Sequence, residues 1–153
     1  MRWRTPRDGM LARATTTTGV LVGGTRDALM IGDERIGWED VESADWDLDT
    51  SVLRVAEVGT WGEQRPVHEL SFEEPGRLLE LIRERVTASV VLQRHVPVRG
   101  RRGLFVIARR SPAGDAPIRW IFEYQDGIDP DDPVVRLAAA AGLAAAQDEV
   151  GTR

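Results

Sequence analysis

The stretch VESADWDLDTSVLRVAEV, residues 41–58, decides the fold of this chain. In its first half apolar and polar side chains alternate, so that Ala44, Trp46 and Leu48 share one face. A period of two residues is typical of a strand with one buried face. A turn at 49–51 separates this run from a second apolar run, and the stretch therefore predicts an antiparallel β-hairpin.

Short extended runs lie on both sides of this hairpin. Glycine and acidic turns separate them, and the runs are residues 10–17, 20–24, 27–31, 34–38 and 66–72. Several short strands with regular turn signals indicate an all-β arrangement. We expect this part of the chain to form a meandering antiparallel sandwich or barrel.

The spacing of apolar residues changes to that of a helix after Glu73. Leucine, isoleucine and valine recur at helical spacing between Glu74 and Ser89. Pro75 suits a first helical turn, and the acidic residues beside it complement the positive end of the helix dipole. The pattern predicts a helix over 74–89.

Three further strands and a second helix are predicted in the last third of the chain. The strand-like runs are 90–98, 103–110 and 118–124. Asp132 is a good N-cap and Pro133 a good first residue for a helix that continues through an alanine-rich run to Ala146. The chain is thus expected to be an α+β protein.

The length of 153 residues suits one domain with an extension. Residues 1–9 are expected to form a flexible N-terminal arm. Residues 10–90 are expected to form the main domain, and residues 91–153 a βββα extension that packs on the same unit.

Two stretches resemble bacterial PH-like domains, namely GGTRDALMI at 23–31 and RIGWEDV at 35–41. The stretch LSFEEP at 70–75, which opens the predicted helix, is also similar to that group. The resemblance covers residues 10–90 and implies a strongly bent antiparallel sheet, a β-barrel or sandwich capped by the helix. Eukaryotic PH domains include binders of phosphoinositides and of peptides, so the resemblance implies binding. The early turn Thr17-Thr18-Gly19 nevertheless carries no basic residue of the lipid-binding kind.

The composition favours a cytoplasmic protein. The chain has no cysteine, which excludes disulfides, thiolate nucleophiles and thiolate metal ligands. It has no run of 18 apolar residues, so no membrane-spanning helix is predicted. The basic start at 1–7 is followed by no apolar segment, and a signal peptide is therefore not expected.

Charge is strongly segregated along the chain. Residues 27–50 hold nine acidic side chains and one arginine, whereas residues 83–110 hold eight arginines and one glutamate. The formal net charge of −5 hides this separation. Such segregation sets long-range fields, and therefore partners, rather than the fold.

The arginine-rich hairpin around residues 99–102 is the predicted binding site, because guanidinium groups offer planar donors to carboxylate or phosphate. The site is expected to comprise Arg94, Arg99, Arg101, Arg102, Arg109 and Arg110, with an acidic counter-surface of Asp40, Glu42, Asp45, Asp47 and Asp49. These residues predict a non-enzymatic module for protein binding or self-association. Binding of an anionic lipid headgroup or a phosphate ligand is the first alternative, and a merely solvated hairpin tip is the other interpretation. Nucleic acid is disfavoured because the sequence pI is near 5.1.

No sequence motif predicts catalysis or a cofactor. The two histidines, His68 and His95, lie on separate predicted strands, and no nucleophile elbow or nucleotide-binding glycine loop occurs. The acidic loop at 126–132 lacks EF-hand spacing, and the start of the second helix explains its last carboxylates. We expect no catalytic residue, metal or cofactor. An enzyme with an unrecognised site around His68 or this loop is the second alternative.

Four of the five tryptophans divide into two groups. Trp46 and Trp120 lie on alternating apolar faces and are expected in the core. Trp3 lies in the predicted arm and Trp61 in a turn, so these two are the candidates for an exposed contact.

Overall fold

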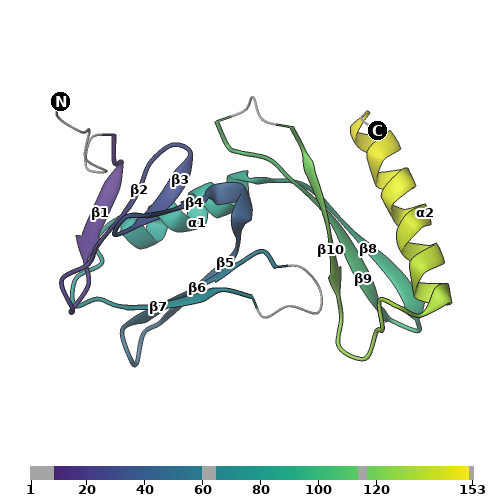
Figure 1. The fold of residues 1–153 in the computed structure, drawn as a ribbon, viewed down its shortest axis with the longest axis horizontal. Helices are drawn as coiled ribbons and strands as arrows, with labels where there is room; N and C mark the ends of the chain where they lie inside the picture. The colour runs from purple at the N-terminus through teal and green to yellow at the C-terminus, as the bar shows by residue number, and fades with distance from the viewer. Residues whose placement is uncertain (1–8, 60–64, 114–116, 152–153) are drawn as a thin grey trace. The chain divides into compact units, whose positions relative to one another are not determined.

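The computed structural model describes residues 9–59, 65–113 and 117–151. The chain divides into two compact units (Figure 1). Unit 1 comprises Met1–Ser89 with Ser111–Asp115, and unit 2 comprises Val90–Arg110 with Ala116–Arg153. The described residues form three antiparallel sheets and two α-helices, which confirms the predicted α+β class. The packing of the extension on the first domain stays a prediction.

Unit 1 consists of two antiparallel sheets and one helix. The first sheet has the order β1-β2-β3-β4, with β1 at Ala12–Thr15, β2 at Leu21–Gly24, β3 at Ala28–Ile31 and β4 at Glu34–Gly37. A 3-10 turn, η1 at Trp38–Asp40, leads into the second sheet. That sheet has the order β5-β6-β7, with β5 at Val41–Asp47, β6 at Val52–Glu57 and β7 at Val67–Ser71.

The described strands of unit 1 do not close into a barrel, so that part of the expectation is wrong. The two sheets share no continuous ladder. Between the end of β1 and the end of β7, one backbone hydrogen bond runs from the amide of Thr17 to the carbonyl of Ser71 at 2.9 Å. The predicted hairpin at 41–58 is confirmed, with Asp47 opposite Val52 across its turn.

The helix of unit 1, α1, runs from Leu78 to Ala88 and begins four residues later than predicted. Gly76 has a φ of +58°, a left-handed conformation in which a helix cannot continue. Pro75 therefore lies in a turn, closed by the hydrogen bond from the amide of Leu78 to the carbonyl of Pro75 at 3.1 Å.

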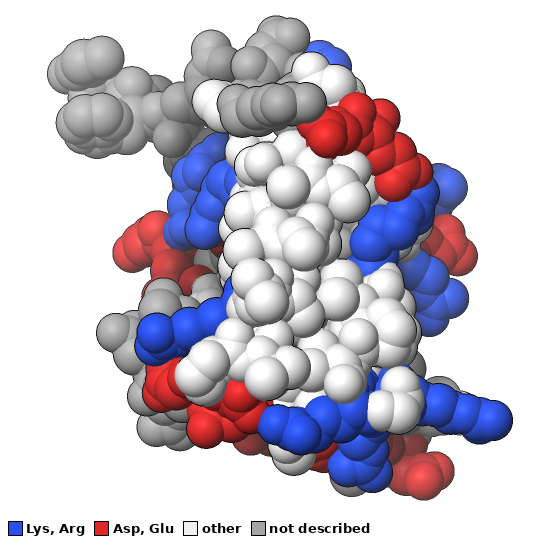
Figure 2. Space-filling model, turned by 90° about the vertical axis from the view of Figure 1, so that its right-hand side faces the viewer, with Lys and Arg blue, Asp and Glu red and all other residues white. Residues whose placement is uncertain are grey.

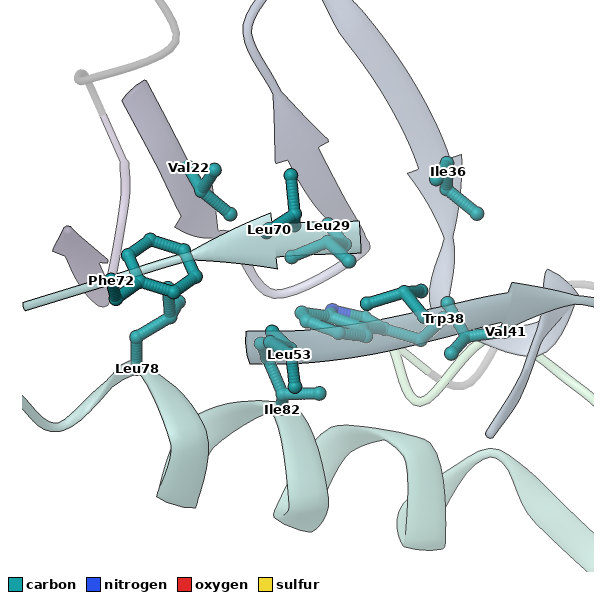
Figure 3. Close-up of a cluster of buried hydrophobic side chains, with 11 residues drawn as sticks. Val22, Leu29, Ile36, Trp38, Val41, Leu53, Leu70, Phe72, Leu78 and Ile82 are labelled. Atoms are coloured by element: carbon teal, nitrogen blue, oxygen red, sulfur yellow. The ribbon is translucent and has the colours of Figure 1, made fainter. Parts of the chain in front are cut away.

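The core of unit 1 lies between the sheets and α1. Trp38 is fully buried at its centre, and its indole Nε1 donates to the carbonyl of Thr25 at 2.9 Å. Leu78 and Ile82 point from α1 toward the strands, where Leu53 and Phe72 lie (Figure 3). Burial of these large apolar side chains is the main stabilising contribution to this unit.

Unit 2 is a three-stranded sheet covered on one face by a long helix. The sheet has the order β10-β9-β8, with β8 at Val90–Arg99, β9 at Arg102–Arg109 and β10 at Arg119–Tyr124. The helix α2 runs from Pro133 to Val150, and Val135, Ala139 and Ala146 face Leu104 and Val106 of β9 in the core. The predicted N-cap is confirmed, because a carboxylate oxygen of Asp132 accepts from the amide of Val134 at 2.9 Å.

Of the tryptophans, Trp46 and Trp120 are half-buried and pack against the cores of units 1 and 2, respectively. Trp3, Trp61 and residues 1–8 of the predicted arm at 1–9 lie outside the described residues. Among the described helices, none combines the length and the apolar character that crossing a membrane would require.

Candidate functional site

The tip of the β8–β9 hairpin places three arginines close together. Arg99 pairs with Arg102 across the tip, and Gly100 between them adopts a φ of +63°. The side chains of Arg99, Arg101 and Arg102 are exposed. The tip therefore has the concentration of guanidinium groups that the sequence indicates.

Most arginines near this tip already have partners inside unit 2. Arg99 Nη2 donates to Asp132 Oδ2 at 2.5 Å, and Arg102 Nη1 donates to the backbone carbonyl of Asp126 at 3.2 Å. Arg94, farther along β8, binds Glu149 of α2 with two donors, of which Nε lies 3.0 Å from Oε2. These bonds tie the hairpin to α2 and to the loop before it, and they reduce the number of guanidinium groups that are open to a ligand.

Arg109 and Arg110 do not belong to the tip. Arg109 ends β9, about 24 Å from Arg102 at the usual rise of a strand, and Arg110 follows it. Arg109 is only 5% exposed. Its burial lowers the pKa of the guanidinium from the usual value, while the charge of Glu123 raises it. The structure therefore splits the six predicted site residues into two groups.

Several residues of the predicted acidic counter-surface take part in local interactions of unit 1. Glu42 forms an ion pair with Arg65, and Asp45 lies opposite Arg54 across the β5–β6 ladder. Asp47 Oδ1 accepts from the amides of Asp49 and Thr50, at 2.9 and 3.2 Å. The backbone carbonyl of Asp40 accepts from the amide of Val58 at 2.8 Å. Asp45, Asp47 and Asp49 are nonetheless exposed, so an acidic surface remains.

The outer face of α2 is a feature that the sequence analysis did not single out. Val134 is 58% exposed and Leu137 is 74% exposed. The remaining outward positions are mainly alanines, exposed at Ala140, Ala141, Ala144 and Ala145. Figure 2, which looks onto the α2 side of unit 2, shows an uncharged band with arginines and carboxylates along both edges.

A signal for this face was present in the sequence. Between Pro133 and Ala146 the helix carries one charged residue, Arg136. A helix that is apolar on all sides either lies in a core or has a partner on its outer side. Alanine favours a helix whatever lies on its outer side, so the alanine run predicts α2 but not a partner for it. The informative property is the near absence of charged side chains from the outer face.

The histidines lie in two different environments. His68 of β7 is half-buried, and its Nε2 lies 2.7 Å from Glu57 Oε2 and 3.3 Å from Glu34 Oε2. His95 is exposed on β8, where its Nε2 lies 2.8 Å from Gln125 Oε1 and its ring contacts Phe105. Within the described part of the chain, the hydrogen-bond partners of both histidines are glutamate or glutamine side chains.

The acidic loop at 126–132 is organised by its own backbone. Asp129 Oδ1 accepts from the amide of Asp131 at 2.9 Å, and Asp132 caps α2. Asp131 also pairs with Arg136, 3.3 Å apart. A separate hollow of the surface is lined by Trp46 and other residues of the second sheet and by Leu48 of the β5–β6 turn, and it includes neither His68 nor this loop.

No protein-family model, curated protein or solved structure matches this chain.

Proposed function

We propose that this chain is a non-enzymatic binding module that associates with a second copy of itself through the outer face of α2. The observation that carries the proposal is the exposure of Leu137 and Val134, at 74% and 58%, on a helix face that has almost no charge. A contiguous exposed apolar surface with a charged border is typical of an interface for another protein.

The distribution of side-chain sizes along α2 favours a second copy as the occupant. Val134 and Leu137 lie in the first half of the outer face, whereas Ala141, Ala144 and Ala145 occupy the second half. Two copies related by a twofold axis perpendicular to α2 would place this helix antiparallel to its partner helix, with the large side chains of one copy over the alanines of the other. Such a face is complementary to itself, as an isologous dimer requires.

The helix dipoles support the same arrangement. Antiparallel helices bring the positive end of each dipole near the negative end of the other. The arginine tip, tied to the start of α2 by the bond from Arg99 to Asp132, would then lie near Glu149 and Asp148 of the second copy. Arg101, which forms no ion pair among the described residues, is the tip residue best placed to steer this encounter.

The anionic lipid or phosphate alternative has less support from this geometry. It needs several guanidinium groups that converge on one ligand, whereas Arg94 and Arg99 are bound to carboxylates of unit 2 and Arg102 to a carbonyl. An anion would have to displace these partners.

We also propose that unit 1 is a PH-like domain with an open rather than closed arrangement of strands. Its four-stranded sheet, its three-stranded sheet and the helix that follows them in the chain support this assignment. A cytoplasmic location belongs to the same proposal, since a chain without cysteine gains nothing from an oxidising compartment.

Analytical ultracentrifugation of the full chain over a concentration series tests the proposal. We expect a monomer–dimer equilibrium, and we expect Leu137→Glu to weaken it at least about tenfold, because the substitution buries a carboxylate against the partner helix. Leu48→Glu is the matched control, since Leu48 is 81% exposed but lies in unit 1.

Two results would overturn the proposal. One is a monomer at every concentration up to about 1 mM, beyond which a dimer is too weak to count as a specific complex. The other is an equal effect of Leu48→Glu and Leu137→Glu. A parallel experiment sediments the chain with vesicles of anionic or of neutral lipid. If a monomeric chain binds the anionic vesicles, headgroup recognition replaces self-association as the function of this protein.

A further inference from the structure

Three side chains with metal-binding donors meet at one edge of unit 1. They come from three strands: Glu34 from β4, Glu57 from β6 and His68 from β7. Their donor atoms all lie within 4.8 Å of one another. The strands belong to the two different sheets of the unit, so the cluster bridges both sheets.

The strand periodicity explains why these side chains converge. Glu34 has the same parity as buried Ile36, and Glu57 the same parity as buried Val55. Side chains two residues apart on a strand point to the same face. His68 shares its face with buried Leu70 in the same way. All three therefore point inward, but they lie at the ends of the apolar rows, where the core meets the solvent.

The charges in this cluster are unbalanced. Two carboxylates lie close to one imidazole nitrogen, which can donate a single hydrogen bond. Among the residues that the structure describes, no arginine forms an ion pair with Glu34 or Glu57, although the chain contains 20 arginines. In the described part of the chain, these two carboxylates therefore have no arginine within ion-pair distance to balance their charge.

We propose that Glu34, Glu57 and His68 bind a divalent transition-metal ion, with Zn²⁺ as the preferred ion. Imidazole nitrogen with carboxylate oxygens suits Zn²⁺ and its neighbours in the first row, whereas Mg²⁺ and Ca²⁺ prefer oxygen ligands alone. The site would add a metal-binding property to unit 1, and it does not depend on self-association through α2.

The two distances from His68 to the carboxylates fit such an ion with a small adjustment. Tetrahedral Zn²⁺ with ligands at about 2.0–2.2 Å holds its donor atoms about 3.3–3.5 Å apart. The pair His68 Nε2 and Glu34 Oε2 is already 3.3 Å apart, and Glu57 Oε2, at 2.7 Å from Nε2, has to move by about 0.6 Å. A rotation within the glutamate side chain is sufficient for this movement.

The exposure of the three side chains allows an ion to enter and leaves one coordination position open to water. Glu34 is 56% exposed, whereas Glu57 and His68 are 23% and 20% exposed. Three protein ligands with one open position are a common arrangement for Zn²⁺. The bound ion would link β4 to β6 and β7 and so hold the two sheets of unit 1 together.

Isothermal titration calorimetry and thermal unfolding of the untagged, chelator-treated full chain test the site. We expect ZnCl₂ at 100 times its dissociation constant to raise Tm by about 5–10 °C, and MgCl₂ to have no comparable effect. Co²⁺ should give visible absorption bands in the range of four-coordinate cobalt, which report directly on coordination by the protein.

The variants separate this site from other histidines and carboxylates. His68→Gln and Glu34→Gln should each weaken Zn²⁺ binding at least about 10- to 100-fold, the loss seen even for residues that only support metal ligands. His95→Gln is the control and should bind as the native chain does, because His95 lies in unit 2. Glu34→Gln alters an exposed side chain and keeps the test decisive if His68→Gln does not fold.

The proposal is overturned if Zn²⁺ gives no heat of binding and no Tm shift with the native chain, and Co²⁺ gives no visible absorption bands. It is equally overturned if His95→Gln abolishes binding and Glu34→Gln does not. In either case His68 serves only as a hydrogen-bonding partner of the two carboxylates.

Discussion

Arg99 and Asp132 form an ion pair, with Nη2 and Oδ2 2.5 Å apart, that ties the tip of the β8–β9 hairpin to the first turn of α2. The other oxygen of the same carboxylate accepts from the amide of Val134 at 2.9 Å. One side chain thus caps the helix and holds the hairpin, so substitutions can separate its two roles.

We expect Asp132→Asn to keep the helix cap and lose the ion pair, because asparagine is as good an N-cap as aspartate. Asp132→Ala loses both and should lower the stability of unit 2 clearly more. Thermal unfolding followed by circular dichroism measures the difference. Arg99→Gln should match Asp132→Asn, and an effect of Arg99→Gln as large as that of Asp132→Ala would contradict the division of roles.

The stability of unit 2 should depend on pH through Asp132. The hydrogen bond from the amide of Val134, together with Arg99, holds the pKa of this carboxyl below its usual value. The stabilisation is therefore complete above the pKa of the unfolded chain, about 3.9, and is lost as the pH falls through the lower folded-state pKa. Urea unfolding of the native chain and of Asp132→Asn between pH 2 and 7 checks this. Identical pH profiles for the two chains would refute it.

Two glycines of the β8–β9 hairpin should respond differently to alanine. A Cβ on Gly103 would lie 1.9 Å from the carbonyl oxygen of Val96, so Gly103→Ala should destabilise unit 2 by about 3 kcal/mol or more. At Gly100 nothing lies within 4 Å, and only the left-handed φ of +63° opposes the substitution. Gly100→Ala should cost about 1–2 kcal/mol. Urea midpoints measure both, and equal losses would show that backbone contact is not the cause at Gly103.

Gly142 allows α2 to approach its sheet. A Cβ there would lie 2.6 Å from Cγ2 of Val96. Alanine gains about 1 kcal/mol in helix propensity, but the overpacking costs about 1–3 kcal/mol, so we expect Gly142→Ala to be neutral or destabilising. In a Val96→Ala background the same substitution should stabilise by about 1 kcal/mol. A double-mutant cycle by urea unfolding checks the coupling, and additive effects would disprove it.

The charge of Arg101 should affect the rate of self-association more than the lifetime of the dimer. Arg101→Glu should lower the association rate constant by up to about tenfold and weaken its dependence on salt. The reason is that an exposed charge at the border mainly steers the encounter. Stopped-flow dilution and mixing at several ionic strengths separates the two rates. Arg35→Glu, an exposed change in unit 1, is the control. A faster dissociation with an unchanged association rate would argue against steering.

The sequence predicted the strands and helices well where the signal is local. Alternation around Trp46 indicated β5, and the pair Asp132 and Pro133 indicated the start of α2. The start of α1 was predicted too early, because Pro75 is compatible with both a first helical turn and an ordinary turn. The φ of +58° at Gly76 resolved that ambiguity, and propensity does not reveal a single backbone angle.

The candidate site was only partly predictable. The sequence located the arginine tip, but it did not show that Arg99 pairs with a carboxylate 33 residues away or Arg94 with one 55 residues away. It gave no reason to associate Glu34 with His68. It also left open which side of the alanine-rich helix is covered.

The sequence by itself determined the α+β fold class, the order of the strands and helices, and the absence of thiol chemistry. These properties depend on composition and on patterns that repeat within a few residues. Only the tertiary structure decided that Trp38 lies at the centre of a core, which arginines are paired with other groups of the chain, and which face of α2 is exposed to solvent. Such outcomes depend on contacts between segments far apart in the chain, and the physical reason is that burial and pairing are properties of the packed elements together.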